Sequence, residues 1–351
     1  MVSGGDVDPD IEARAIRDAV GAGAKVINLS LGGNRNPKDP ALDEFSRAER
    51  NAISYAFKRG TLVVAAVGNS PDDSGQYASW PAALRHVVGV SAVSQSLAWA
   101  PFSNTDPVFN DVAAPGVGII TTVPRSLAPT GSSLDAPPGF TIQADGTVLG
   151  TSFAAPHVSA AAAVLFARHP EFSPTQVMWI LEHAAHRLGD TTGVGRDRFT
   201  GFGLLDVTAA VKLADGPLAN LPPADADEPN DVAIDAQILP VTNGSIDAVA
   251  DFGDDRRDVY KLFLHAGDTL RVGTAPLPLG GNLGLDVAIF PPGATNLAGS
   301  ASWLALRRPN FTSSSLRIRN STPADGFYYI QVSARRGWGG YRLRWNVTPG
   351  Q

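Results

Sequence analysis

In residues 1–214 the order of hydrophobic and polar positions shows two patterns in turn, a helical spacing and short apolar runs. Apolar residues recur at helical spacing from Ile11 to Val20, directly after Asp8 and Pro9, and residues 41–59 repeat this helical pattern. Short, almost continuously apolar runs lie between and after them, at residues 25–31, 62–67, 86–93 and 117–123. Such runs are typical of parallel strands that are covered on both faces. We therefore predict an α/β fold in which helices cover both faces of a parallel sheet.

A different pattern begins after residue 214. Residues 215–229 are rich in Asp, Pro and Ala, which predicts a linker. In residues 230–351 apolar and polar positions then alternate, as at Tyr341, Leu343 and Trp345. A period of two is typical of antiparallel strands with one buried face. We therefore predict a second domain in residues 230–351, an all-β sandwich or jelly roll.

Composition narrows the possible functions. The chain has 351 residues, of which 44% are hydrophobic, and this is enough for two domains with cores of their own. Its net charge is -6 and it has no Lys/Arg-rich run, so we expect no nucleic-acid partner. It contains no cysteine, which excludes disulfides, thiolate catalysis and cysteine-bound metals. No apolar run reaches the length of a transmembrane helix, so we expect no membrane partner.

One stretch, from Gly150 to Val158, combines the features that a nucleophilic serine needs. Gly150 permits a sharp bend, and Ser152 then falls in the first turn of a helix made of small apolar residues. Pro156 is tolerated because the N–H that it lacks would have no partner in a first turn. The Ser152 hydroxyl would lie beside unpaired N–H groups, which suits a reaction that creates an oxyanion. The alternative is a serine that only caps a core helix, and we expect this helix to be buried on every side.

The stretch closely resembles the nucleophile motif of the subtilisin-like serine proteases, G-T-S-x-A-x-P-H. Further segments match in family order, at residues 26–32, 64–69, 77–90 and 202–206. The resemblance covers residues 7–214 and implies a serine endopeptidase that hydrolyses peptide bonds through an acyl-enzyme on Ser152. It also implies that the Asn69 amide and the Ser152 N–H stabilise the oxyanion, and that the chemistry needs no cofactor or catalytic metal.

The resemblance also implies where a protein or peptide substrate would bind. Ser30, Leu31 and Gly32 would line one side of the cleft, where an open strand edge can pair with an extended peptide. Ser79 would lie near the floor of the primary specificity pocket. Because no acidic residue stands there, we expect no strong preference for Arg or Lys. The remaining substrate-binding residues are Ala66, Val67 and Gly68 in the pocket wall and Thr151 beside the nucleophile.

The predicted β domain resembles the bacterial pre-peptidase C-terminal domain. The matching segments are Asp227–Asp231, Asp258–Leu262 and Phe327–Val332. Such domains are typical of secreted hydrolases, so the resemblance implies an extracellular or cell-envelope protein, although residues 1–6 have no signal-peptide character. An acidic group in this domain could bind structural calcium, but a solvated loop is the interpretation that we favour. Its members are Asp251, Asp254, Asp255 and Asp258.

The base that a serine nucleophile requires is not found. A nucleophilic serine needs a histidine and an orienting carboxylate, which the family carries in H-G-T-x-V-A-G and D-[ST]-G segments. No His-Gly pair occurs in the chain. His157 is five residues along the helix from Ser152, which places it about 140° around the axis and facing away. A D-S-G string at residues 73–75 follows Asn69, out of family order, and is better interpreted as a turn.

We therefore expect a truncated chain, inactive alone, whose Asp and His segments lie upstream of Met1. The alternative is a catalytically dead scaffold, or one half of a split enzyme, that presents the β domain as a binding module. An unrelated α/β hydrolase is disfavoured, because its G-x-S-x-G elbow needs a second glycine where Ala154 stands.

Overall fold

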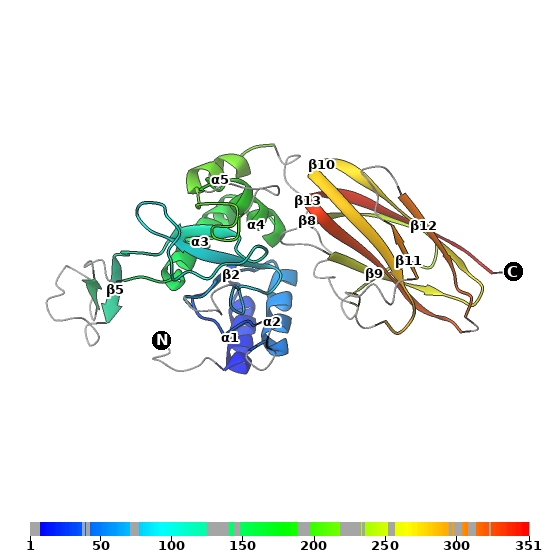
Figure 1. The fold of residues 1–351 in the computed structure, drawn as a ribbon, viewed down its shortest axis with the longest axis horizontal. Helices are drawn as coiled ribbons and strands as arrows, with labels where there is room; N and C mark the ends of the chain where they lie inside the picture. Colours follow the sequence, from blue (N-terminus) through cyan, green and yellow to red (C-terminus); the bar gives the residue numbers. More distant parts are fainter. Residues whose placement is uncertain are drawn as a thin grey trace. The chain divides into compact units, whose positions relative to one another are not determined.

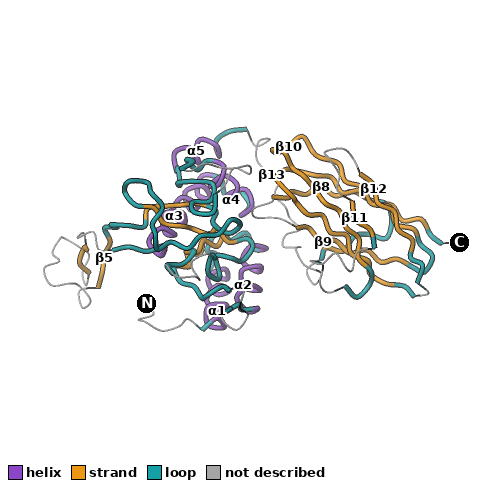
Figure 2. The backbone as a smooth tube through the Cα atoms, in the orientation of Figure 1, coloured by secondary structure: helices purple, strands orange, loops and turns teal. Residues whose placement is uncertain are grey.

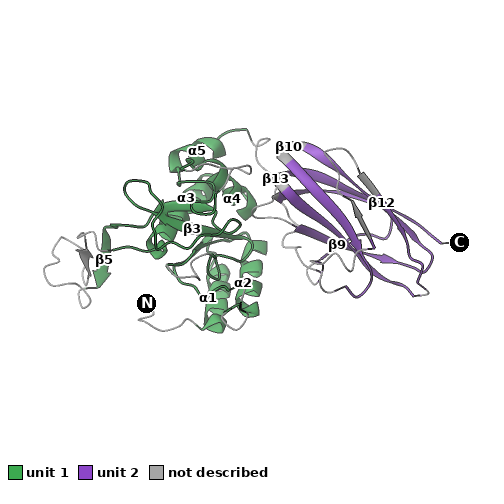
Figure 3. Ribbon diagram, viewed as in Figure 1, with its two compact units in different colours: residues 1–217 green, residues 218–351 purple. Residues whose placement is uncertain are grey.

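Two compact units make up the chain, residues 1–217 and residues 218–351 (Figure 3). The computed structural model describes residues 8–36, 39, 43–70, 77–124, 140–143, 148–188, 197–217, 233, 236–251, 257–294, 297, 304–307, 314–322 and 324–350. Of the predicted linker, only residues 215–217 are among them. None of the described helices combines the length and the apolar character that crossing a bilayer requires.

The first unit is built on a four-stranded parallel sheet (Figure 1). Its strands pair in chain order: β1 (Val26–Leu29), β2 (Leu62–Ala66), β3 (Val87–Val93) and β4 (Val112–Pro115). β2 and β3 are buried at every position, whereas β1, at one edge, is fully buried only at Leu29. The apolar runs at the two central strands follow from this position, because strands inside a doubly covered sheet have no face in water. The predicted α/β fold with a parallel sheet is confirmed.

Helices cover both faces of this sheet. α1 (Pro9–Gly21) and α2 (Arg47–Lys58) pack against one face, where Ile16 and Ile53 join Val63 and Ala65 in one core cluster. α3 (Thr151–Arg168) contacts all four strands, and α4 (Pro174–His183) and α5 (Val207–Ala214) pack beside it. The sheet therefore positions the start of α3 at the ends of the strands, where the predicted site residues lie.

Side-chain caps determine where the helices begin. Asp8 accepts a hydrogen bond from the Asp10 N–H at 2.8 Å, ahead of Pro9, as its position before the apolar repeat predicts. α2 begins at Arg47 rather than near residue 41, because the Ser46 hydroxyl caps it. The early start predicted from the apolar spacing is therefore wrong.

The prediction of a fourth parallel strand at residues 117–123 is also wrong. The fourth strand is β4, which ends at Pro115, and the chain then leaves the sheet. β5 (Thr121–Pro124) pairs instead with β6 (Phe140–Gln143) in a separate antiparallel pair. Ile120 is 70% exposed, so the apolar content of this run does not reflect burial in the parallel sheet.

The prediction that α3 is buried on every side is wrong as well. Its inward face is buried, at Ala154, Val158, Ala161 and Leu165 among others. The opposite face is exposed at Pro156, His157, Ala160, Ala163, Val164 and Ala167. The sheet and the two neighbouring helices cover only part of a helix that is apolar on both faces.

The second unit is an all-β domain with mainly antiparallel pairing, as the period of two predicts. Its strands are β7 (Gln237–Ile238), β8 (Gly244–Asp251), β9 (Arg257–Leu264), β10 (Thr269–Phe290), β11 (Ala305–Arg307), β12 (Ser314–Arg319) and β13 (Gly326–Thr348). The long strands β10 and β13 pair with each other (Figure 2). The other edge of β13 pairs first with β9 and then with β8. The other edge of β10 pairs first with β12 and then with β11. Tyr341, Leu343 and Trp345 all point into the core.

Candidate active site

Ser152 lies in the first turn of α3, beside the end of β1. Gly150, with a φ of 144°, makes the bend before the helix and donates its N–H to the Gly116 carbonyl oxygen at 2.8 Å. The Ser152 hydroxyl donates to the Ser30 carbonyl oxygen at 3.3 Å, and the Ser30 hydroxyl donates to the Ser152 carbonyl oxygen at 2.7 Å. Two reciprocal hydrogen bonds therefore join the predicted nucleophile to the predicted cleft residue.

Two further side chains extend this contact. Asn28 Nδ2 donates to the Ser30 hydroxyl at 2.9 Å, and the Ser159 hydroxyl donates to Asn28 Oδ1 at 2.9 Å. A chain of hydrogen bonds thus runs from α3 to β1 and back to Ser152. Sequence reasoning missed Asn28 and Ser159, and the signal for Asn28 was a polar residue at a strand position within the matching segment 26–32.

Asn69 is held at the other side of the α3 start. It follows Gly68, which directs the chain out of β2 with a φ of 106°. Its side-chain oxygen accepts hydrogen bonds from the Thr151 N–H at 2.8 Å and from the Thr151 hydroxyl at 2.9 Å. Because the oxygen faces Thr151, the Asn69 NH₂ group points away from Thr151. Asn69 Nδ2 lies beside Gly150, in the segment that contains Ser152. The Thr151 N–H donates to Asn69 and the Phe153 N–H to the Gly150 carbonyl oxygen at 3.0 Å, whereas no hydrogen bond among the described residues uses the Ser152 N–H.

The residues predicted for the specificity pocket come together around Gly68. Ala66 and Val67 are buried at the end of β2, and the Ser79 N–H donates to the Val67 carbonyl oxygen at 2.9 Å. Asn104 Nδ2 donates to the Ser79 hydroxyl at 3.2 Å, and the Asn104 N–H donates to the Gly68 carbonyl oxygen at 3.0 Å. Asn104 is the member of this group that sequence reasoning did not assign to the site. These neutral polar groups lie where the resemblance places the pocket floor.

Leu31 and Gly32 continue the chain from Ser30. Leu31 is half-buried against the core cluster under α1 and α2. A Cβ on Gly32 would collide with the Trp80 carbonyl oxygen, and the next residue, Gly33, exchanges two backbone hydrogen bonds with Trp80 at 2.9 and 3.0 Å. Backbone pairing therefore holds this segment in place beside Ser152.

Sequence comparison shows the family of the first unit. The profile of the subtilase family, peptidase S8, matches residues 1–203, more than half of the chain. The chain belongs to the subtilase family. This agrees with the sequence resemblance and with the parallel sheet that positions Ser152 and Asn69.

Two relatives and one solved structure illustrate the match. Fervidolysin from Fervidobacterium pennivorans is 35% identical over 223 residues, which are 61% of this chain and 29% of the relative. Subtilisin DY from Bacillus licheniformis is 34% identical over 191 residues, which are 54% of this chain and 58% of the relative. The crystal structure of a lanthipeptide protease has 28% identity and a TM-score of 0.47, covering 59% of this chain and 67% of that one. The chain thus spans less than two thirds of the length of either relative.

The described contacts of this subtilase join none of its six histidines to Ser152, and all six lie within the described residues. His157 is exposed on the outer face of α3, and its Nδ1 lies 2.9 Å from the Phe153 carbonyl oxygen. His183 is packed on Trp179, and burial lowers its pKa to about 4. His157 therefore lies on the outer face of the helix, as the helical angle predicts, and His183 is half-buried against Trp179.

The remaining histidines have contacts elsewhere. His86 packs on Phe57, His169 pairs with Glu171 and Asp215, His186 exchanges backbone hydrogen bonds with Leu204, and His265 belongs to the β domain. The D-S-G string at residues 73–75 lies outside the described residues. In the part of the subtilase chain that the structure describes, no histidine is therefore in hydrogen-bond contact with Ser152, the predicted nucleophile.

The acidic group suggested for calcium is only partly described. Asp254 and Asp255, and the side chain of Asp251, lie outside the described part. Asp258 is fully buried and accepts a hydrogen bond from the Tyr341 hydroxyl, which places it in the domain core rather than in a solvated loop. No group of three or more His, Cys, Asp or Glu among the described residues could hold a metal ion.

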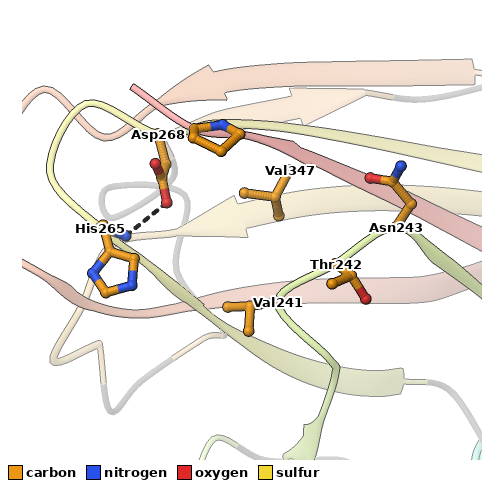
Figure 4. A pocket seen from close by; sticks show the side chains of 7 residues that line it. Val241, Thr242, Asn243, His265, Asp268 and Val347 are labelled. Atoms are coloured by element: carbon orange, nitrogen blue, oxygen red, sulfur yellow. Dashed lines mark hydrogen bonds between the residues drawn. The ribbon is translucent and has the colours of Figure 1, made fainter. Parts of the chain in front are cut away.

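The β domain also has an open groove of about 340 Å³ (Figure 4). His265, Asp268 and Asn243 supply polar groups to its lining. The Asp268 carboxylate accepts hydrogen bonds from the His265 N–H at 2.9 Å and from the Gly350 N–H at 3.0 Å. Asn346 Nδ2 donates to Asn243 Oδ1 at 2.7 Å. These groups connect a turn and two strand ends, so their contacts stabilise the domain.

Proposed function

We propose that this subtilase chain supplies the nucleophile and the oxyanion site of a serine endopeptidase. The observation that carries the proposal is the contact between Asn69 and Thr151, which fixes a side-chain amide beside Ser152. The Ser152 hydroxyl oxygen would bond to the peptide carbonyl carbon, and the carbonyl oxygen would take up negative charge. Asn69 Nδ2 and the Ser152 N–H would donate to that oxygen. The proton removed from Ser152 would pass to the peptide nitrogen, the C–N bond would break and the amine would leave an acyl group on Ser152. Water would then hydrolyse this ester to the acid and restore the Ser152 hydroxyl.

The attack requires a group that takes the proton from Ser152. In the described residues the Ser152 hydroxyl donates to the Ser30 carbonyl oxygen, which is not a base at neutral pH. We propose that the histidine and its carboxylate are carried by a further segment, either continuous with this chain or separate. No cofactor is needed for this chemistry.

Two surfaces support docking of such a segment. The exposed apolar face of α3 begins at the turn that contains Ser152. The strand β1 is at an edge of its sheet, and an edge strand offers unpaired main-chain donors and acceptors. A segment that pairs with β1 and covers α3 would place its side chains at the end of β1, where Ser30 meets Ser152.

The same geometry supports a protein or peptide substrate. An extended peptide would lie along residues 30–32, with one side chain directed toward Val67, Gly68 and Ser79. The neutral hydroxyl of Ser79 and the neutral amide of Asn104 favour no strong selection of Arg or Lys. Kinetics on a peptide panel would test this, and a dominant basic preference would contradict it. The resemblance of residues 230–351 to a domain of secreted hydrolases favours action outside the cell or in the cell envelope.

A second candidate function is a catalytically dead scaffold that presents the β domain to a partner. The hydrogen bond that occupies the Ser152 hydroxyl, together with the missing imidazole in the described residues, favours this alternative.

Labelling with a fluorophosphonate probe separates the two candidates. Residues 1–351 alone should label Ser152 slowly and hydrolyse no peptide, and a form that includes the base-bearing segment should do both rapidly. Ser152→Ala should abolish labelling in either form. Labelling of residues 1–351 alone at the rate of an intact subtilisin would refute the proposal that the chain lacks a base for Ser152. Slow labelling in every form would favour the scaffold.

A further inference from the structure

Two glutamates meet in the interior between α1 and α2. Glu12 of α1 is 6% exposed and Glu49 of α2 is 5% exposed. The two helices pack along each other, and the pKa of each carboxyl group depends on the other, which places the two side chains within interaction distance. Positions of this kind are normally apolar, because an ionised carboxylate loses its hydration when it is buried.

Two carboxyl groups this close can form a hydrogen bond only by sharing a proton, because two ionised carboxylates are both only acceptors. Burial raises the pKa of Glu12. Burial, the charge of Glu12 and the hydrogen bond to it raise the pKa of Glu49 to about 8. At neutral pH Glu49 therefore keeps its proton and donates it to Glu12.

Cationic groups on the same helices have other contacts. Arg17 lies over the Tyr55 ring at 5.0 Å, and Arg50 lies over the Phe45 ring at 5.7 Å. Glu12 Oε1 is buried without a hydrogen-bond partner among the described residues. The other charged side chains of the two helices, their caps and residues 43–46 are exposed, except that Asp43 is half-buried. The exposed ones are Asp8, Asp10, Arg14, Asp18, Glu44, Arg47, Lys58 and Arg59.

We propose that the Glu12–Glu49 pair is a pH-sensitive clasp between α1 and α2. While the pair shares a proton, it ties the helices together. Loss of that proton places two like charges side by side in the interior, where their repulsion is strong, and drives the helices apart. The core cluster under the helices includes Ala65 and Val67, so opening of the clasp acts on the strand that leads to Asn69.

The direction of the pH effect follows from the pKa values. Both carboxyl groups have a higher pKa in the folded chain than the ordinary 4.5, so folding takes up protons. Their contribution to stability is fully present below the unfolded pKa and is lost as the pH rises through the folded pKa, about 8 for Glu49. The clasp therefore weakens toward alkaline pH.

Urea unfolding of the 351-residue chain at about pH 6 and about pH 9 tests the proposal. The variant Glu12→Gln/Glu49→Gln keeps the shape of the pair without its charges, and Glu171→Gln changes an exposed glutamate as a control. The unfolding midpoint of the first unit should fall more steeply with pH in the wild type and in Glu171→Gln than in the double variant. An equal fall in all three would overturn the proposal.

Two measurements on the wild type keep the test independent of whether the double variant folds. A carboxyl-carbon NMR titration should show one glutamate with a midpoint near the raised pKa of Glu49, coupled to a second glutamate. Amide protection in α1 and α2 should decrease on going to alkaline pH, while α4 serves as an internal reference. Titration of every glutamate near its ordinary pKa, or an equal loss of protection in α4, would refute the clasp.

Discussion

The side-chain oxygen of Asn69 accepts two hydrogen bonds from a single residue, Thr151, at 2.8 Å from its N–H and at 2.9 Å from its hydroxyl. A backbone N–H can only donate, so this contact determines which end of the amide faces Thr151. Asn69 Nδ2 lies 3.5 Å from the point where a Cβ on Gly150 would be. Thr151, the residue directly before Ser152, therefore sets the direction of the Asn69 amide.

The variant Asn69→Ala removes this donor. In the assembled peptidase we expect kcat to fall by about 10²–10³, with little change in KM, because the lost hydrogen bond forms only in the transition state. The magnitude is the one established for the corresponding asparagine in subtilisin, a relative, and steady-state peptide hydrolysis measures it. The matched control is Thr151→Ser, which keeps both donors to Asn69 and should lose far less. An Asn69→Ala variant with unchanged kcat would exclude Asn69 from the oxyanion site.

Gly68 should tolerate no side chain. Its φ of 106° is strained for other residues, and a Cβ there would meet the Ser79 hydroxyl and Asn104 Nδ2. We expect Gly68→Ala to destabilise the first unit by about 2–3 kcal/mol, as measured by urea unfolding. Gly21→Ala is the control, because nothing lies within 4 Å of its Cβ position and its φ is ordinary. That control should change stability by less than about 1 kcal/mol in either direction. Equal effects of the two variants would contradict the close packing at the end of β2.

Much of the first unit could be predicted from local pattern. The central strands follow from continuous apolar runs, and α1 and α4 begin at a capping residue followed by Pro. The sequence-based predictions are wrong where the burial of a residue depends on elements that are distant in the sequence. Ile11 fits the helical repeat but is 55% exposed, whereas Glu12, its neighbour, is buried against Glu49 of another helix. No local pattern indicates that the interior of a helix pair will contain two carboxyl groups.

In the candidate site, too, some residues could be predicted from the sequence and others depend on distant elements. Ser152, Asn69 and Ser79 could be located because they stand in recognisable motifs. The contribution of Asn28 could not, since it depends on a side-chain contact with Ser159 on a helix more than a hundred residues away. Motifs in the sequence identify the candidate site residues, whereas the side chains that contact them are seen only when β1 and α3 are placed side by side.

His183 should make the first unit sensitive to mild acid. Its pKa, lowered to about 4 by burial, is below the ordinary value of 6.5, so the folded chain binds fewer protons than the unfolded chain. Its contribution to stability is present above pH 6.5 and is lost as the pH falls through about 4, by about 3 kcal/mol at most. His183→Phe keeps a ring beside Trp179 and should flatten this part of the pH profile of urea unfolding. The exposed control, His157→Asn, should leave the profile unchanged, and a His183→Phe profile equal to that of the wild type would refute the prediction.

The buried hydroxyl of Tyr341 should be the most sensitive point of the β domain core. It donates to the Asp258 carboxylate and lies 2.8 Å from the Tyr260 hydroxyl, and all three side chains are fully buried. Tyr341→Phe deprives a buried carboxylate of a donor, so we expect a loss of about 2–4 kcal/mol. Tyr260→Phe removes a contact between two neutral groups and should cost about 1 kcal/mol. Amide protection in β9 and β13 measures both variants in the second unit alone. If Tyr260→Phe were as damaging as Tyr341→Phe, the stabilisation would reside in the pair of tyrosines rather than in the contact with Asp258.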